Sequence, residues 1–179
     1  MTYIHQLEQR KPFHQQTVVF SLHALALWIY MVLVLGHWSE HVMQIYQVYI
    51  LGWLPKQAGG ILGLWYPWLA AAEILHFTYN ALQLAGLVAL RSGIRGRARP
   101  WWNVALGAQV WHFFEHLLLQ VQWLTGYYLF GASQQMGIGQ LWVPRLELHF
   151  LYNLVVFLPT VIAVVFYFRE FKQQNASRA

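Results

Sequence analysis

Four long apolar segments run along the chain, separated by short polar or glycine-rich stretches. They cover roughly residues 18–50, 64–90, 101–130 and 146–168. About 20 residues of helix cross a bilayer core of ~30 Å, so each segment is long enough to span a membrane. The breaks between them read LPKQAGG, RSGIRGRARP and GASQQMGIG, which are typical of turns and loops. The pattern therefore predicts an all-α integral membrane protein, a bundle of four transmembrane helices.

The basic residues predict the orientation of these helices. Of the 11 Lys and Arg residues, nine fall in the two tails and the second loop, whereas two fall in the first and third loops. By the positive-inside rule both termini are cytoplasmic, and we expect a plasma or inner membrane. No cleavable signal peptide is expected, because the first apolar segment lacks a small-residue cleavage site. The predicted layout is a polar cytoplasmic tail (1–16), a first helical hairpin (17–90), a basic cytoplasmic loop (91–100), a second hairpin (101–168) and a cytoplasmic tail (169–179).

The composition supports a membrane environment. Hydrophobic residues make up 58% of the chain and charged residues 9%, against about 25% charged in typical globular domains. The net charge of +5 does not indicate a nucleic-acid partner, because the basic residues lie between apolar segments rather than in a stripe with exposed aromatics. Membrane lipids are the expected surroundings. Cysteine is absent, which excludes disulfides and thiolate metal ligands.

The two predicted hairpins repeat one another. The sequence HWSEH at 37–41 aligns with HFFEH at 112–116, an offset of 75, and HFTYN at 76–80 aligns with HFLYN at 149–153, an offset of 73. Each half therefore carries HxxEH on its outgoing helix and HFxYN on its returning helix. Because both hairpins start on the same side of the membrane, the halves form a parallel repeat with a pseudo-twofold axis along the membrane normal.

The repeated polar residues are predicted to share one buried layer. Residues three and four apart lie on one face of a helix, so each HxxEH motif points its histidines and glutamate the same way. Counted from the basic loops, at about 1.5 Å per residue, the histidines of the last three helices lie ~20–30 Å from the cytoplasmic face. Ionisable groups at such depth are found paired, metal-bound or beside water.

This layer predicts a metal centre in the outer half of the bilayer. Imidazole with carboxylate is the ligand set of iron, zinc, copper and manganese sites, and carboxylates can bridge two ions. We expect two transition-metal ions, with iron as the favoured metal. Glu40 and Glu115 are predicted to be bridging carboxylates at the reacting centre. The predicted ligands are His37, Glu40, His41, His76, His112, Glu115, His116 and His149. Glu73, Asn80 and Asn153 are predicted to bind weakly or to orient the imidazoles.

Several neighbouring residues receive more ordinary predictions. Tyr79 and Tyr152 lie one position off the histidine face, so no role is assigned to them. Glu147 is expected to meet Arg145 or water near the outer end of the fourth helix.

Three function classes fit this site. The first is a membrane oxidoreductase with a dinuclear centre that acts on a lipid-soluble substrate and takes electrons from a donor or partner subunit. In ligand chemistry it resembles the histidine-rich membrane di-iron desaturases and hydroxylases, whose HxxxH and HxxHH boxes are partly met by His37/His41 and His112/His116. The second is an electron carrier with b-type haem between paired histidines, or a protein that binds a quinone. The third is a metal or proton transport or assembly subunit of a larger complex.

Overall fold

The computed structural model is all-helical: helices make up 80% of it, and residues 13–176 contain no strand. The structure describes the backbone of residues 13–176 and the side chains of residues 22–173, so most of the predicted N-terminal tail lies outside the described residues. The elements are α2 (Phe13–Tyr49), η1 (Pro55–Gln57), α3 (Gly60–Trp65), α4 (Pro67–Ala70), α5 (Glu73–Leu90), α6 (Ala98–Thr125), η2 (Leu129–Gly131), η3 (Gly139–Leu141) and α7 (Arg145–Ala176).

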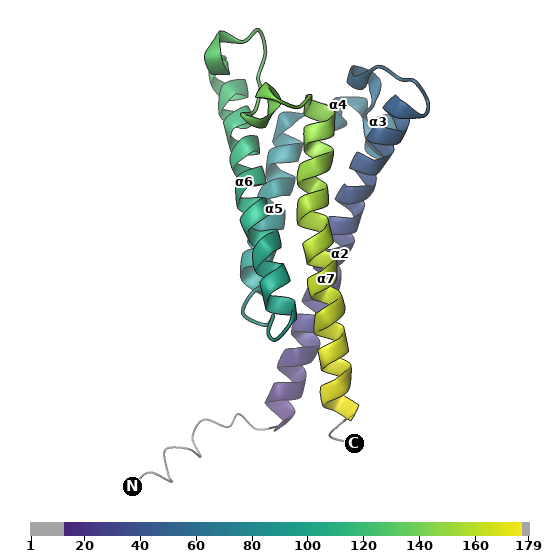
Figure 1. Cartoon of the computed structure of the whole chain (residues 1–179), viewed down its shortest axis with the longest axis vertical. Coiled ribbons are helices and arrows are strands. Elements are labelled where there is room, and N and C mark those ends of the chain that lie inside the picture. Colours follow the sequence, from purple (N-terminus) through teal and green to yellow (C-terminus); the bar gives the residue numbers. More distant parts are fainter. Residues whose placement is uncertain (1–12, 177–179) are drawn as a thin grey trace.

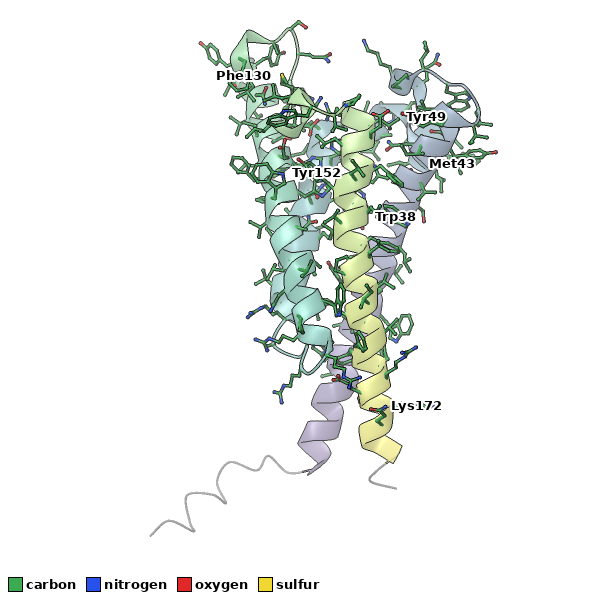
Figure 2. All side chains as sticks on the ribbon, in the orientation of Figure 1. Trp38, Met43, Tyr49, Phe130, Tyr152 and Lys172 are labelled. Atoms are coloured by element: carbon green, nitrogen blue, oxygen red, sulfur yellow. The ribbon has the colours of Figure 1, made fainter. Side chains whose placement is uncertain are left out.

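The long helices α2, α5, α6 and α7 run side by side along the length of the molecule (Figure 1). Helix α6 packs against both α5 and α7, and α2 packs against α7, whereas the contact between α2 and α5 is smaller. The start of α2 and the end of α7 lie at one end of the bundle, here called the terminal end (Figure 1). The connections α2–α5 and α6–α7 lie at the other, here called the loop end. Figure 2 shows Tyr49 and Phe130 at the loop end and Lys172 near the terminal end.

The first and last long helices, α2 and α7, are longer than the apolar segments that predicted them. Helix α2 begins at Phe13, inside the predicted tail, and α7 continues to Ala176, well past residue 168. Hydropathy marks only the apolar part of a helix, whereas its backbone hydrogen bonds continue through polar residues until a breaker occurs. Residues 13–16 and 169–176 of the two predicted tails are therefore helical.

The predicted helix over 64–90 is broken into pieces. Pro67 lacks an N–H and disfavours helical geometry at the preceding residue, and Tyr66 accordingly has φ −136° and ψ 67°. A second break follows at Ala72, which is extended (ψ 119°), and α5 starts only at Glu73. The 18 residues of α5 are about 27 Å long.

Within the part of the chain that the structure describes, two helices are long and apolar enough to cross a membrane, over Leu22–Tyr49 and Arg145–Gln173, with mean hydropathies of 1.5 and 2.2. The sequence pattern predicted four such helices. Helices α5 and α6 carry more polar residues along their length, including Asn80, Gln83, Gln109 and Gln120. These residues are buried, so they lower the hydropathy of the two helices without being exposed on the surface.

Near the loop end polar side chains are buried inside the bundle and large apolar side chains lie on its surface, the reverse of a soluble protein. Buried there are Glu73, His112, Glu115 and other polar side chains, whereas large apolar side chains are exposed on the bundle surface. At the terminal end the core is apolar, with Leu27, Leu87, Trp102, Ala163 and their neighbours. The bundle thus has two interior regions. The region toward the loop end, which contains the histidines together with Glu73 and Glu115, is here called the polar chamber, and the region toward the terminal end is the apolar core. Large exposed apolar residues include Trp28, Val32, Leu82, Val104, Trp123, Leu151 and Val155.

Candidate metal centre

Six histidines from all four long helices meet in the polar chamber. They are His37 and His41 on α2, His76 on α5, His112 and His116 on α6, and His149 on α7. The ring of His149 lies between the halves: its centroid is 4.9 Å from that of His116, 6.1 Å from that of His41 and 6.4 Å from that of His76. The predicted convergence of the histidines is therefore present in the structure.

The histidines of the second hairpin form the tightest group. One ligand atom from each of His112, His116 and His149 lies within 4.8 Å of the others, and these three residues are here called the second-half triad. The two Nε2 atoms of His112 and His116 are 3.2 Å apart. Two imidazole nitrogens that bind one ion at ~2.1 Å lie about 3.0–3.4 Å apart, so this pair fits adjacent positions on a metal ion. The second-half triad can therefore hold a transition-metal ion.

Backbone carbonyls fix the orientation of two imidazoles. Nδ1 of His149 lies 2.8 Å from the carbonyl oxygen of Arg145, and Nδ1 of His76 lies 3.2 Å from that of Ala72. A carbonyl can only accept, so Nδ1 carries the proton and Nε2 keeps its lone pair in the neutral ring. Both rings are thus held in the tautomer that binds metal through Nε2.

A buried carboxylate supports His116. The Nδ1 of His116 is 3.5 Å from Oε1 of Glu73, which is only 4% exposed. The other Glu73 oxygen accepts hydrogen bonds from Arg145 and from Gln135. Glu73 thus lies beside the imidazole of His116, and its charge is balanced by the guanidinium of Arg145. Among the described residues, Nδ1 of His112, Nδ1 of His116 and Oε1 of Glu73 are buried without a hydrogen-bond partner, so the polar groups of this site are not fully satisfied by the protein itself.

The equivalent residues of the first hairpin, His37, His41 and His76, are more open. The Nε2 atoms of His37 and His41 are 3.1 Å apart, close to the distance in the second half. Nδ1 of His41 is 2.9 Å from Oε1 of Gln44, which takes the place that Glu73 has beside His116. Among the described residues, however, only the second-half triad brings three ligand atoms within 4.8 Å. We call His37, His41 and His76 the first-half triad.

The two repeated glutamates bind backbone rather than histidine. Both oxygens of Glu40 accept from the amide of Leu62, at 3.1 and 3.0 Å, and Oε1 of Glu115 accepts from the amide of Gly139 at 2.9 Å. Each carboxylate thereby fastens the loop that follows its helix. The bridging role stays a prediction, and the structure gives these oxygens another set of partners.

A glutamine about two turns after each repeated glutamate also holds the loop that follows its helix. Gln47 both donates to and accepts from the backbone of Gly60, at 3.0 and 2.9 Å. Gln122, at the same position of the second half, bonds Met136 in the same two ways. Gly60 has φ +71°, and an added Cβ there would lie 2.2 Å from Oε2 of Glu40. Glycine is therefore required at this loop position for both its conformation and its close approach to the carboxylate.

Two tyrosines without an assigned role contact the site in both halves. The ring of Tyr79 stacks on His37, with centroids 4.0 Å apart, and the ring of Tyr152 lies 5.2 Å from His112. Their place in the repeated HFxYN motif was a signal that they lie near the histidines, although they are one position off the histidine face of their own helix. The repeated asparagines donate to backbone carbonyls one turn back: Asn80 to His76 at 2.9 Å and Asn153 to His149 at 2.8 Å.

The predicted contact between Glu147 and Arg145 is wrong. Arg145 pairs with Glu73 of α5, whereas Glu147 accepts a hydrogen bond from the hydroxyl of Tyr49 on α2. Glu73 and Arg145 are 72 residues apart, so no local pattern connects them. The pair fastens the starts of α5 and α7 to each other beside the histidines.

Two cavities reach the histidines. The loop-end cavity has a volume of about 670 Å³ and is lined by polar residues of the loops together with Glu73, Arg145 and His149. The lateral cavity has a volume of about 300 Å³ and lies between α2 and α5. His41 and His76 line both cavities, so two histidines of the first-half triad border the two spaces.

No protein-family model matches the chain, and no significant match is found among curated proteins or solved structures. The features that bear on function are therefore the geometry of the histidines and the two cavities beside them.

Proposed function

We propose that this protein is a membrane-embedded, metal-dependent oxidoreductase that acts on a lipid-soluble substrate. In this proposal α2, α5, α6 and α7 form a four-helix membrane bundle built from a duplicated hairpin, with both termini cytoplasmic in a plasma or inner membrane. The loop end then faces the outer side. Electrons are exchanged with a separate donor or partner subunit, because no motif of the chain marks a second redox group.

The surface of the bundle supports the membrane placement. Large apolar side chains are exposed along all four long helices, and Val32 and Trp123 are 66% and 58% exposed. In water such a surface is unfavourable, whereas in lipid it needs no further cover. The basic residues Arg91, Arg97 and Lys172 lie toward the terminal end, on the side that the positive-inside rule assigns to the cytoplasm.

The second-half triad is the single observation that carries the metal assignment. Three histidines with ligand atoms within 4.8 Å, two of them fully buried, are an expensive arrangement in an apolar surround unless an ion or a hydrogen-bond network satisfies them. We propose two ions, one at each triad. The second-half triad is closed and holds its ion tightly, and the first-half triad keeps open positions, as catalytic sites do.

The close histidine pairs within α2 and within α6 fit ions rather than haem. A haem with two histidine ligands needs them on opposite faces of a flat macrocycle. The Nε2 atoms of His112 and His116 face each other at 3.2 Å, and those of His37 and His41 at 3.1 Å. A macrocycle does not fit between such pairs, whereas one ion does.

The chain's own residues prepare this chemistry. An all-imidazole set suits iron, copper or zinc, and iron or copper would supply electron transfer and Lewis acidity at this position. The carbonyls of Ala72 and Arg145 hold imidazoles in the binding tautomer, and Glu73 places a negative charge next to the cationic centre. Tyr79 covers one face of His37, on the side of the lateral cavity.

The first experiment is elemental analysis with an optical spectrum, on protein purified in mild detergent without added metal. The proposal expects roughly two transition-metal ions per chain, iron or copper, and no Soret band. A strong Soret band would replace it with a haem carrier. Absence of both metal and pigment, with no uptake of added Zn²⁺, would leave a polar-cored transport or assembly subunit.

A further inference from the structure

The lateral cavity has apolar walls and a polar inner end. Its walls include Val32 and Leu33 on α2 and Leu75 on α5, and Val32 and Leu33 are exposed on the outer surface of the bundle. Its inner end is formed by the histidines of the first-half triad. The volume of about 300 Å³ lies at the lower end of the range of small-molecule sites, ~300–1,000 Å³.

One residue distinguishes this region from its counterpart in the second half. Gly36 lines the lateral cavity, and a Cβ added to it would meet nothing within 4 Å. In the repeat alignment Gly36 corresponds to Trp111, one position before His112 as Gly36 is one position before His37. The indole Nε1 of Trp111 donates to the hydroxyl of Tyr152 at 2.9 Å, so the indole lies across the groove between α6 and α7.

The tyrosines confirm that the same groove is compared. Tyr152 in the second half corresponds to Tyr79 in the first, and Tyr79 lines the lateral cavity. Without an indole beside it, Tyr79 donates its hydroxyl proton to the backbone carbonyl of Leu33 and stacks on His37. The first half therefore keeps an opening at the place where the second half has an indole, and this opening leads to the more open triad.

The shape and chemistry of the cavity define its occupant. Aliphatic side chains line it at Val32, Leu33 and Leu75, and Tyr79 already stacks on His37, so its ring is engaged. Along α2 the polar lining follows the aliphatic lining and includes Glu40 and Gln44 beside the histidines. These features fit an unbranched aliphatic chain with a hydrogen-bonding group at one end. The exposed side of the cavity faces the region that the proposed function assigns to lipid.

We propose that the lateral cavity between α2 and α5 binds a single-chain lipid, with its polar end against His37, His41 and His76 and its chain leading out past Val32 and Leu33 into the bilayer. This inference rests on the proposed function and names the substrate class and the entry path. Trp111 prevents the second half from binding a chain in the same way, so the protein has one substrate site despite its repeated halves.

A photoactivatable long-chain alcohol, with a diazirine along its chain, tests this site in the full-length protein in lipid nanodiscs. Cross-links mapped by mass spectrometry should concentrate on the peptides that contain Leu33 and Leu75. The variant Gly36→Trp, which copies the second half, should reduce this labelling at least about tenfold. Gly107→Trp is the matched control, because it adds the same indole at an exposed glycine of α6 with open space around it, and labelling should stay unchanged.

The outcomes separate the cavity from the metal. Undiminished labelling in Gly36→Trp, or labelling spread evenly over the surface of the bundle, overturns the inference even if metal is present. Loss of labelling with metal content retained supports it, and cavity labelling in protein that binds no metal supports the cavity while removing the proposed function. If Gly36→Trp does not fold, Leu33→Trp closes the cavity from the preceding turn. The reciprocal variant Trp111→Gly should create new labelling between α6 and α7.

Discussion

The two hairpins carry the same histidines in the same spacing, yet they differ in how ready those histidines are to bind a metal. In the second hairpin α6 and α7 pack closely, and His112, His116 and His149 bring their ligand atoms within 4.8 Å. In the first, α2 packs loosely against α5, and the corresponding histidines line two cavities. The comparison teaches that packing around a ligand set, rather than its sequence spacing, determines how tightly the set closes.

Particular residues account for the difference. The indole of Trp111 lies across the groove of the second half, where Gly36 leaves space in the first. Glu73 gives His116 a charged partner, whereas His41 has the neutral amide of Gln44. A negative charge next to an imidazole raises its basicity and its affinity for a cation, so the second-half triad should bind metal more tightly.

The largest expected effect is on Zn²⁺ affinity and comes from two single variants, each of which removes one histidine from one half. His116→Ala should weaken the tightest Zn²⁺ site by at least about 100-fold, since it deletes one of three close ligands. His41→Ala, the matched change in the first half, should leave that site in place and affect only the weaker one. Titration of purified protein with Zn²⁺ against a chelating indicator measures both. Equal losses in the two variants would show that the halves bind metal as one unit.

The next effect concerns the charged partner of His116. Glu73→Gln keeps the shape of the side chain but removes the charge near Nδ1 of His116, and it should weaken the second-half site by roughly 10–100-fold. Glu147→Gln is the control, because Glu147 contacts Tyr49 and lies apart from the histidine contacts. The same Zn²⁺ titration applies. If Glu73→Gln binds as tightly as the control, the carboxylate only pairs with Arg145.

The repeated glutamates provide a test of loop fastening against metal bridging. Glu115→Gln should cost about 2 kcal/mol, because it replaces a charged acceptor of a backbone amide, and this lowers the melting temperature by about 4–8 °C. Glu40→Gln should act in the same direction and less strongly, since Glu40 is less buried than Glu115. Metal content should be unchanged in both. A loss of metal at constant melting temperature would restore the bridging role.

The smallest effect separates backbone strain from contact with a carboxylate. Gly52 and Gly60 both have φ +71°, but an added Cβ at Gly52 meets nothing within 4 Å, whereas at Gly60 it meets Glu40. Gly52→Ala should therefore cost about 1 kcal/mol, and Gly60→Ala about twice that. Thermal unfolding of the two variants in the same detergent gives the difference. Equal costs would mean that Glu40 moves freely away from the loop.

The histidine chamber could be predicted because its information is local. Residues at i, i+3 and i+4 share a helix face whatever the rest of the fold does, and the repeat supplied the second pair of helices. The partners of the acidic residues could not be predicted in this way. Glu40 and Glu115 bind loop amides, and the path of a loop depends on contacts distant in sequence. The pairing of Glu73 with Arg145 joins two helix starts for the same reason.

The helix boundaries show a different limit. Pro67 was a visible signal for a break, but the apolar run around it favoured one continuous helix over 64–90. Hydropathy also predicted four spans, whereas among the described residues only Leu22–Tyr49 and Arg145–Gln173 reach the apolarity of a span. Buried polar residues such as Asn80 and Gln109 lower the hydropathy of α5 and α6. Helices that bury polar residues inside a bundle thus give a weaker membrane signal than helices that are apolar throughout.

Under the proposed function, the shared lining of the two cavities by His41 and His76 has a consequence for kinetics. The loop-end cavity is lined largely by residues of the loops, and the lateral cavity is the more apolar of the two. A substrate that dissolves in lipid would be concentrated in the bilayer by partition, while water-soluble reactants and protons would arrive from the aqueous phase. In this proposal the rate follows the mole fraction of substrate in the bilayer. Diluting the membrane with inert lipid is then expected to slow turnover even when the amount of substrate per volume of suspension is constant.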